Sequence, residues 1–325
     1  MTLKARLLRE LKAIDGKNIC LGIARPIFVI ISICTVCAYL GGFHQILELT
    51  THYRLQYLLG ALFTLILYAF SRRRIEVLVC LFCVGLNAIE ILPWYLPAPS
   101  PAATTPLRVM LSNVLTSNER YGDFLNYVAE EDPSVLVLME INDTWQKQLG
   151  PVRQRLPYFL EIPDSDNFGI ALYSKFPLSN ALGQYWAEER YAPASITANI
   201  TVDGKPLTLI ATHPLPPLKP DYFSQRNAHM VEMADFVNKQ KNAAIVMGDL
   251  NMSLWSPNFR SFLKTTQMRS NRQGVGIQPS WPVDIPLLRI PIDHCLVSRA
   301  IAVKTSRIGK DIGSDHYPVI VDLAI

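Results

Sequence analysis

The stretch "VMGDLNMS", which begins at Val246, ends an apolar run on two polar side chains, Asp249 and Asn251. A carboxylate at the end of a buried strand is costly to desolvate unless a nearby group compensates its charge. The pattern therefore indicates either a tight turn or a site that holds a cation.

Other short apolar runs also begin or end at polar side chains of three kinds. Carboxylates offer hard oxygen ligands, amides can donate to phosphate oxygens, and imidazoles titrate near neutral pH. The carboxylates are Glu140, Asp249 and Asp315, the amides are Asn113 and Asn251, and the imidazoles are His213 and His316. Each of them alone also fits a turn or a strand-end hydrogen bond, whereas together they form a set suited to metal-assisted chemistry.

Residues 107–325 contain many short apolar runs, typical of strands, and fewer stretches with helical spacing. Helices are expected at 121–131, 222–240 and 256–266, whereas 168–211 contains several strands in succession. This order argues against a simple parallel doubly wound sheet and favours two mixed sheets with flanking helices.

The motifs "SNV", "MEI", "FGIALYSK", "THP", "GDLN", "IDHCLV" and "SDHYPV" occur in that order. Together they resemble the endonuclease/exonuclease/phosphatase superfamily, the DNase I-like metal-dependent phosphodiesterases, and the chain looks like its membrane-tethered bacterial members. The resemblance covers nearly all of 107–325, and "GDLN" followed by "SDHYP" is its most specific part. It implies an α+β fold, a four-layer α/β/β/α sandwich of two mixed sheets, with the site at one end of the sheets.

The resemblance also implies a metal site. Glu140 resembles the primary metal ligand, Asp315 a further acidic ligand, and Asn113 the amide that helps position metal and phosphate. The expected ion is Mg²⁺, with Mn²⁺ as a substitute, because Mg²⁺ takes few protein carboxylates beside water and phosphate. Leu115 stands where the abasic-site branch has an acidic residue, so a DNA-repair role is not expected.

The remaining residues are assigned by the same resemblance to the reaction itself. Asp249 and Asn251 look like the pair that orients the attacking water and contacts the phosphate. His316 resembles the histidine beside the scissile phosphate, and Asp293 the carboxylate that holds it. His213 matches a second histidine at the phosphate, found in the DNase and sphingomyelinase branches.

Residues 1–96 are expected to form a membrane region with about three transmembrane helices, at roughly 19–43, 53–71 and 75–96, because about 20 apolar residues cross a bilayer. A cleaved signal peptide is the competing interpretation, but two further apolar runs follow without an obvious cleavage site. A helical hairpin with the third segment at the interface is another alternative. Residues 97–106, rich in proline, are predicted to be a linker to the domain at 107–325.

Charge predicts the orientation. Lys and Arg number 10 against 5 acids before residue 107, and "SRRR" at 71–74 joins two of the spans. The positive-inside tendency places this loop and the N-terminus in the cytoplasm, so a bacterial inner (plasma) membrane protein with an extracytoplasmic catalytic domain is expected. The CxxC pairs at Cys34 and Cys80 lie in the spans and are interpreted as packing residues.

The sequence thus predicts an enzyme that hydrolyses a phosphate ester near the membrane by attack of an activated water. The substrate could be a lipid headgroup, a nucleic acid or a small phosphoester. After residue 106 the chain has 21 basic and 22 acidic residues, which argues mildly against a nonspecific duplex-DNA binder. A membrane-anchored nuclease acting on extracytoplasmic DNA or RNA, and a non-catalytic binding protein, are the alternatives. The apolar stretch 281–290 before Asp293 is interpreted either as core or as an apolar rim of the site.

Overall fold

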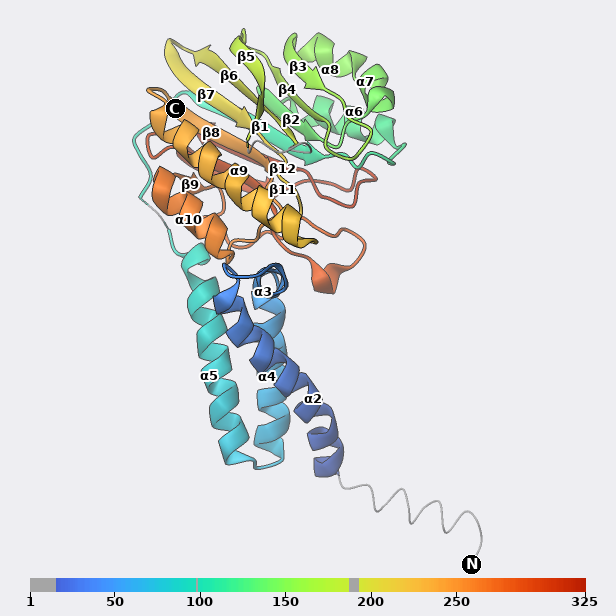
Figure 1. Cartoon of the computed structure of the whole chain (residues 1–325), viewed down its shortest axis with the longest axis vertical. Helices are drawn as coiled ribbons and strands as arrows, with labels where there is room; N and C mark the ends of the chain where they lie inside the picture. Colours follow the sequence, from blue (N-terminus) through green and yellow to red (C-terminus); the bar gives the residue numbers. More distant parts are fainter. Residues whose placement is uncertain (1–15, 98, 187–192) are drawn as a thin grey trace, which may run out of the picture.

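The computed structural model describes residues 16–97, 99–186 and 193–325 of the chain. Two parts are evident in Figure 1: a stem of helices from the N-terminal third, and a head built around two β-sheets. The stem meets the head at one end of the sheets, and this junction adjoins the candidate site described below.

Each sheet has six strands and mixes parallel with antiparallel pairs. The first has the order β11-β12-β1-β2-β4-β3 and the second the order β5-β6-β7-β8-β10-β9. The strands of the first sheet are β1 (Pro106–Asn113), β2 (Val135–Met139), β3 (Tyr158–Ile162), β4 (Ile170–Ser174), β11 (Ala302–Ile308) and β12 (Val319–Ala324). Those of the second are β5 (Ser179–Tyr185), β6 (Ala194–Val202), β7 (Lys205–Ala211), β8 (Ala243–Asp249), β9 (Arg269–Ser270) and β10 (Asp293–Val297).

One parallel pair lies near the middle of each sheet. Strands β1 and β2 are joined through helix α6 (Tyr121–Glu131), and strands β7 and β8 through helix α9 (Pro220–Lys239). A parallel pair needs such a crossover, and both carboxyl ends then emerge at the same sheet edge. The residues at or just after the ends of these strands are therefore brought together in pairs, Asn113 with Glu140 and His213 with Asp249.

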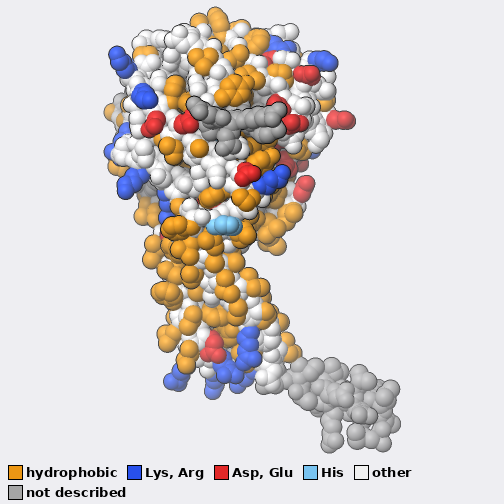
Figure 2. Space-filling view, in the orientation of Figure 1, with side chains coloured by type: hydrophobic (Ala, Val, Ile, Leu, Met, Phe, Trp, Pro, Cys, Tyr) orange, Lys and Arg blue, Asp and Glu red, His pale blue; other side chains and the backbone are white. Residues whose placement is uncertain are grey.

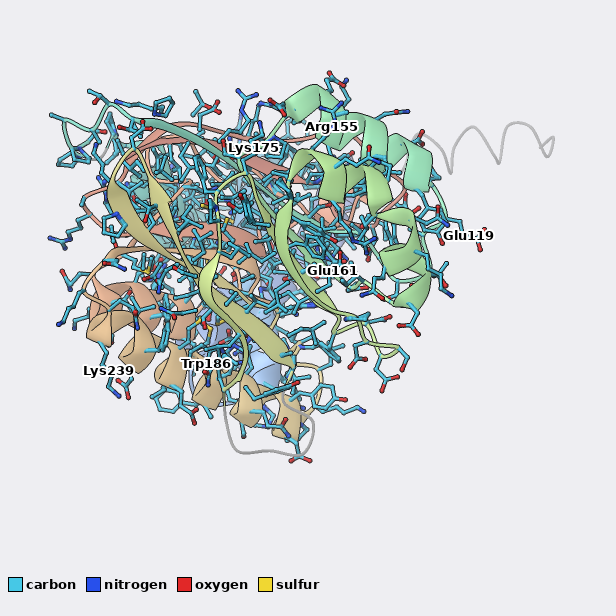
Figure 3. The ribbon with its side chains drawn as sticks, turned by 90° about the horizontal axis from the view of Figure 1, so that it is seen from above. Glu119, Arg155, Glu161, Lys175, Trp186 and Lys239 are labelled. Carbon is cyan, nitrogen blue, oxygen red and sulfur yellow. The ribbon has the colours of Figure 1, made fainter. Side chains whose placement is uncertain are left out.

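Apolar side chains fill the space between the sheets and also both outer faces. Side chains from the inner faces of both sheets, such as Val109, Val137 and Ile245, form the central core. Helix α6 packs with α7 (Asp143–Gln148) and α8 (Gly150–Arg155) on the first sheet, and α9 packs with α10 (Pro257–Thr266) on the second. Seen from above, Glu119, just before α6, and Lys239, at the end of α9, lie on opposite sides of the paired sheets (Figure 3). This arrangement confirms the predicted four-layer α+β sandwich.

From residue 16 on, where the description of the stem begins, it has four helices and two short 3₁₀ turns. They are α2 (Gly16–Cys37), η1 (Ala38–Leu40), α3 (Gln45–Thr51), α4 (Arg54–Phe70), α5 (Arg74–Ile91) and η2 (Leu92–Tyr95). Within the described residues, two stretches are long and apolar enough to cross a membrane, 16–40 and 74–95. Helices α3 and α4, bent by 66° at their junction, qualify as a third only if the bent pair is one span. Hydrophobic side chains cover the stem, and Lys and Arg gather at the end farthest from the head (Figure 2).

The segment predicted to be a linker begins where the stem is already fixed to the head. The carbonyl of Trp94 accepts hydrogen bonds from the backbone of Gly274 at 2.9 Å and of Gly276 at 3.1 Å. At the other end of the segment, Thr105 pairs with Ile325 through two backbone hydrogen bonds. Stem and head are thus in direct contact.

Gly169 is required by the close approach of two chain segments next to the candidate site. Its carbonyl accepts from the backbone N–H of Ile141 at 3.2 Å, directly after Glu140. A Cβ atom at position 169 would lie 1.8 Å from the carbonyl oxygen of Ile141, which is far inside van der Waals contact. Any side chain here must displace the backbone that presents Glu140.

We therefore expect Gly169→Ala to lower the free energy of unfolding by about 1–3 kcal/mol, the usual cost of overpacking. The measurement is the thermal unfolding midpoint of the purified full chain. Gly122→Ala is the matched control, because a Cβ at this exposed helical position meets nothing within 4 Å. A midpoint for Gly169→Ala equal to that of Gly122→Ala would contradict the close approach.

Candidate active site

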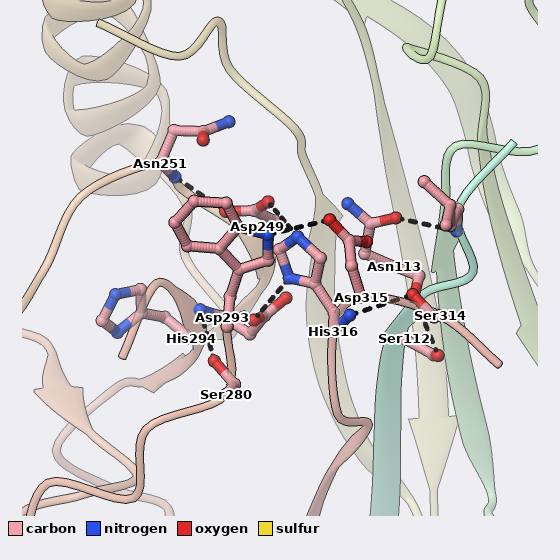
Figure 4. Close-up of polar contacts among 12 residues, drawn as sticks. Ser112, Asn113, Asp249, Asn251, Ser280, Asp293, His294, Ser314, Asp315 and His316 are labelled. Atoms are coloured by element: carbon pink, nitrogen blue, oxygen red, sulfur yellow. Dashed lines mark hydrogen bonds and ion pairs between the residues drawn. The ribbon is translucent and has the colours of Figure 1, made fainter. Parts of the chain in front are cut away.

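His316 lies between two buried carboxylates. Its Nδ1 is 3.0 Å from Oδ2 of Asp293, and its Nε2 is 3.7 Å from Oδ2 of Asp249 (Figure 4). The antiparallel register of β8 and β10 places Asp293 directly opposite Asp249, so two neighbouring strands supply the pair. Burial disfavours the charged imidazolium, but the carboxylates, Asp293 first among them, outweigh burial and raise the pKa of His316 to about 10. His316 is therefore an imidazolium at neutral pH.

The two carboxylates differ in their proton affinity. Burial raises the pKa of Asp249, and the negative charge of Asp293 raises it further. Burial also acts on Asp293, but the charge and the hydrogen bond of His316 prevail and hold the pKa of Asp293 below its usual value. Environments that push two pKa values apart are typical of acid–base pairs, with Asp293 kept ionised and Asp249 able to take up a proton.

Glu140 follows β2 in a left-handed backbone conformation, with φ of 62°. This conformation is costly for a residue with a side chain, and such strain is concentrated at functional sites. The carboxylate is fixed by Asn113, whose Nδ2 donates to Oε1 at 2.8 Å, and by the backbone N–H of Thr116, which donates to Oε2 at 3.4 Å. Burial raises the pKa of Glu140, and the bond from Asn113 opposes this. Oδ1 of Asn113 accepts from Leu115, so both ends of this amide are engaged in positioning Glu140.

Asp315 presents a carboxylate oxygen to the same space. Trp281 donates from Nε1 to Oδ2 at 2.9 Å, whereas Oδ1 is buried and has no hydrogen-bond partner among the described residues. The charge of Asp315 raises the pKa of Glu140, as expected for neighbouring carboxylates. An unpaired buried oxygen beside a second carboxylate fits a divalent cation that prefers oxygen ligands.

Asp249, Asp293 and His316 form a second group that could hold a metal, since their ligand atoms lie within 4.8 Å of one another. The group around Glu140 and Asp315 offers oxygen atoms alone, which Mg²⁺ and Mn²⁺ prefer, whereas the second group includes an imidazole. We therefore propose that the group around Glu140 and Asp315 holds the metal and that the group around His316 handles protons.

Asn251 and His213 complete the surroundings of Asp249. The backbone N–H of Asn251 donates to Oδ1 of Asp249 at 2.9 Å, and its Nδ2 donates one hydrogen to the carbonyl of Pro214 at 3.0 Å, which leaves the second hydrogen for a ligand. Nε2 of His213 lies 3.6 Å from Oδ2 of Asp249. Burial, helped by the charge of His316, lowers the pKa of His213 to about 3, so this ring is neutral.

A cavity of about 580 Å³ opens onto these groups. Of the residues predicted from the sequence, six line it, and Asn113 and Asp293 lie behind Glu140 and His316 as their hydrogen-bond partners. The six are Glu140, His213, Asp249, Asn251, Asp315 and His316. Side chains far apart in the sequence are thus brought to one cavity.

Sequence reasoning missed several residues that hold this arrangement. The hydroxyl of Ser314 donates to the carbonyl of Asn113 at 2.8 Å and so connects β1 to the segment before β12. Arg272 is fully buried and donates to the backbone carbonyls of Asp293 and Ile277, which fixes the start of β10. No local pattern marks Arg272, because its partners are carbonyls of distant segments. The sequence also gave no sign that stem residues line the cavity.

The chain matches the model of the endonuclease/exonuclease/phosphatase family over residues 110–316, and it belongs to this family.

Solved structures show the same fold. A family member from Beutenbergia cavernae has a TM-score of 0.56 at 17% identity, over 68% of this chain and 72% of its own. D. rerio TDP2, complexed with single strand DNA product, has a TM-score of 0.57 at 15% identity, over 68% of this chain and 100% of its own. A beta toxin from Staphylococcus aureus has a TM-score of 0.53 at 16% identity, over 66% of this chain and 99% of its own. A search of curated proteins gives no match. Family membership and fold are therefore as the sequence predicted.

The assignment of the metal site makes a prediction about binding. Mn²⁺ should raise the thermal unfolding midpoint of the full chain, because a ligand that binds only the folded state stabilises it. Glu140→Gln should abolish most of this shift, since it removes a carboxylate charge and leaves the shape unchanged. The exposed Glu119, at the far edge of the head (Figure 3), gives the control Glu119→Gln, which should keep the shift. An undiminished shift in Glu140→Gln would refute the assignment.

Proposed function

We propose that this chain is a divalent-metal-dependent phosphodiesterase or phosphatase that hydrolyses a phosphate ester close to a membrane by attack of an activated water. The observation that supports it best is the pairing of His316, charged between Asp249 and Asp293, with two further carboxylates in one cavity. Family membership supports the same reaction class, because the family comprises enzymes that act on phosphate esters.

Asp249 is proposed to orient the attacking water and accept its proton. Its raised pKa suits a general base, and the bond from Asn251 fixes the carboxylate. His316 holds a proton on Nε2 at the cavity and can donate it to a phosphate oxygen or to the leaving group. Asp293 remains ionised behind it and keeps the ring charged and oriented. The neutral His213 can offer a hydrogen bond to the phosphate from the opposite side.

Glu140 and Asp315 are proposed to hold the cation, for which Mg²⁺ or Mn²⁺ suits the oxygen ligands. When bound, the ion neutralises negative charge on the phosphate oxygens. Asn113 keeps the Glu140 carboxylate in place through the 2.8 Å hydrogen bond, and Trp281 does the same for Asp315. All four side chains are thus positioned before a substrate arrives.

The stem is proposed to anchor the enzyme in a bacterial inner membrane, with α2, α4 and α5 as three spans, while α3 lies against the head. The turn between α4 and α5 lies at the end of the stem away from the head (Figure 1), and it carries Arg72 and Arg73, with Arg74 at the start of α5. The positive-inside tendency then favours a cytoplasmic turn and an extracytoplasmic head.

A membrane-anchored nuclease is the second candidate function. The fold shared with D. rerio TDP2, which was solved with a single strand DNA product, supports it, since the same chemistry cleaves nucleic acid esters. A non-catalytic binding protein that uses the fold is the third, and the intact set of acid–base and metal-binding residues speaks against it.

Activity can be tested with the purified full chain and bis-p-nitrophenyl phosphate. We expect hydrolysis with Mg²⁺ or Mn²⁺, no hydrolysis after chelation, and a decrease in kcat by a factor of roughly 100 to 10,000 in Asp249→Asn, as for loss of a general base. Asp235→Asn, at an exposed position of α9, is the matched control and should retain full activity.

Activity that survives Asp249→Asn would refute the site. A metal-loaded wild type that hydrolyses neither this ester, nor nucleic acids, nor phospholipids would favour the binding protein. Hydrolysis of DNA or RNA alone would favour the nuclease.

The orientation predicts which single cysteines a membrane-impermeant maleimide can label in intact cells. Asp203→Cys, on the exposed hairpin between β6 and β7, should be labelled, whereas Arg73→Cys, at the far end of the stem, should react only after the membrane is opened. The unsubstituted chain corrects for the native thiols. The reverse pattern would overturn the orientation.

A further inference from the structure

The candidate active site is not built by the head alone. In the stem, α3 ends at Thr51 and α4 begins at Arg54, and we call residues 49–53 at this bend the elbow. Leu49, His52 and Tyr53 of the elbow line the same cavity as Glu140, Asp249 and His316. Figure 1 shows α3 at the end of the stem that lies directly beneath the head. A wall of the cavity therefore comes from the N-terminal segment.

A buried ion pair fixes the elbow to the segment that follows β8 and carries Asn251. Glu48, just before the elbow, lies 3.2 Å from Arg226 of α9, and both side chains are fully buried. Arg226 also donates to the backbone carbonyl of Asn251 at 3.1 Å, and Ser256 donates to Glu48 at 2.5 Å. A buried ion pair adds little to the free energy of unfolding, because its two charges are costly to desolvate. It does hold the two side chains at a defined position relative to each other. The elbow is thus held at a defined position relative to Asp249.

His52 contributes its ring to this wall. Its side chain is 5% exposed, and its Nδ1 is enclosed by protein atoms without a hydrogen-bond partner among the described residues. The ring therefore presents packing surface to the cavity.

The lining of the cavity combines polar and apolar side chains. The carboxylates and His316 share it with Leu49 and Tyr53 of the elbow and with Phe168, Pro216, Pro217 and Leu218, and Asp166 and Asn167 also line it. Among the described residues that line it there is no Lys or Arg, whereas a site for a polyanion such as a nucleic acid depends on such residues. The lining fits a phosphate ester whose remaining part is apolar.

Exposed apolar side chains lie both at the cavity and where the head meets α4. The turn η3 (Pro286–Leu288) rests on α4, where Nε2 of Gln56 donates to the carbonyls of Leu287 and Arg289. Leu287 is 83% exposed, and Leu218, at the cavity itself, is 66% exposed. The exposed Leu287, beside α4 of the apolar stem, is suited to contact with lipid.

We propose that the elbow is a substrate-binding wall, contributed by the membrane anchor, which selects amphiphilic phosphoesters by holding their apolar chain while the head hydrolyses the ester. This inference rests on the proposed hydrolase function and names its substrate class. Leu49 and Tyr53 contact the chain, and the ring of His52 lies beside them in the wall.

Two synthetic diesters test it, hexadecyl 4-nitrophenyl phosphate and methyl 4-nitrophenyl phosphate, which share the scissile bond and differ only in the alkyl chain. The full chain is assayed in detergent with Mn²⁺. We expect kcat/KM to be higher for the hexadecyl ester, and Leu49→Gln and Tyr53→Ala to reduce the ratio of the two values about tenfold, through KM, as for loss of an apolar pocket contact. Leu47→Gln is the matched control, since Leu47 is equally half-buried on α3 but does not line the cavity, and it should keep the ratio.

An equal kcat/KM for both esters in the wild type, or a ratio unchanged in Leu49→Gln and Tyr53→Ala, would overturn the proposal. If these two variants lose hydrolysis of the methyl ester as well, Leu49→Ala, which shortens the apolar side chain without adding a polar group, decides by the same ratio. Inhibition of methyl ester hydrolysis by a single-stranded oligonucleotide but not by hexadecyl phosphate would also overturn it. Failure of the wild type to hydrolyse either ester would refute instead the proposed hydrolase function.

Discussion

Compensation of buried charge is the constraint on which the arrangement of the head depends. Asp249, Asp293 and His316 are all buried, and none could be charged there alone, because desolvation of an isolated ion is too costly. The charge of each carboxylate is compensated by His316, and the charge of His316 is compensated by the two carboxylates. The two sheets must therefore pack so that the end of β8, the start of β10 and the segment before β12 lie at the same place. The chemistry of the site and the packing of the fold impose the same geometry.

The two parallel strand pairs explain why this place lies at one end of the sandwich. Crossovers through α6 and α9 bring the carboxyl ends of β1, β2, β7 and β8 to one edge. The polar strand ends of the two sheets lie at the same end of the central core. The close approach of Gly169 to Ile141 fixes the backbone position of the adjacent Glu140. The scaffold is rigid because both faces of each sheet are covered, so the polar groups are positioned in advance of binding.

Much of this could be predicted from the sequence, because the information is local. Apolar runs ending on Asn113, Glu140 and Asp249 identify buried strands with polar tips, and the order of the motifs identifies the family. Contacts between distant segments could not be predicted. Arg272 binds carbonyls, which no residue type reveals, and Glu48 in an apolar segment gives no sign that its partner is Arg226 more than a hundred residues away.

Arg226 couples two parts of the chain that lie far apart in the sequence. One guanidinium contacts both the stem, at Glu48, and the segment after β8, at the carbonyl of Asn251. Without the stem, this buried cation would lose the carboxylate that compensates its charge, right beside the candidate site. Removal of the stem is therefore expected to destabilise the head as well as to open one wall of its cavity.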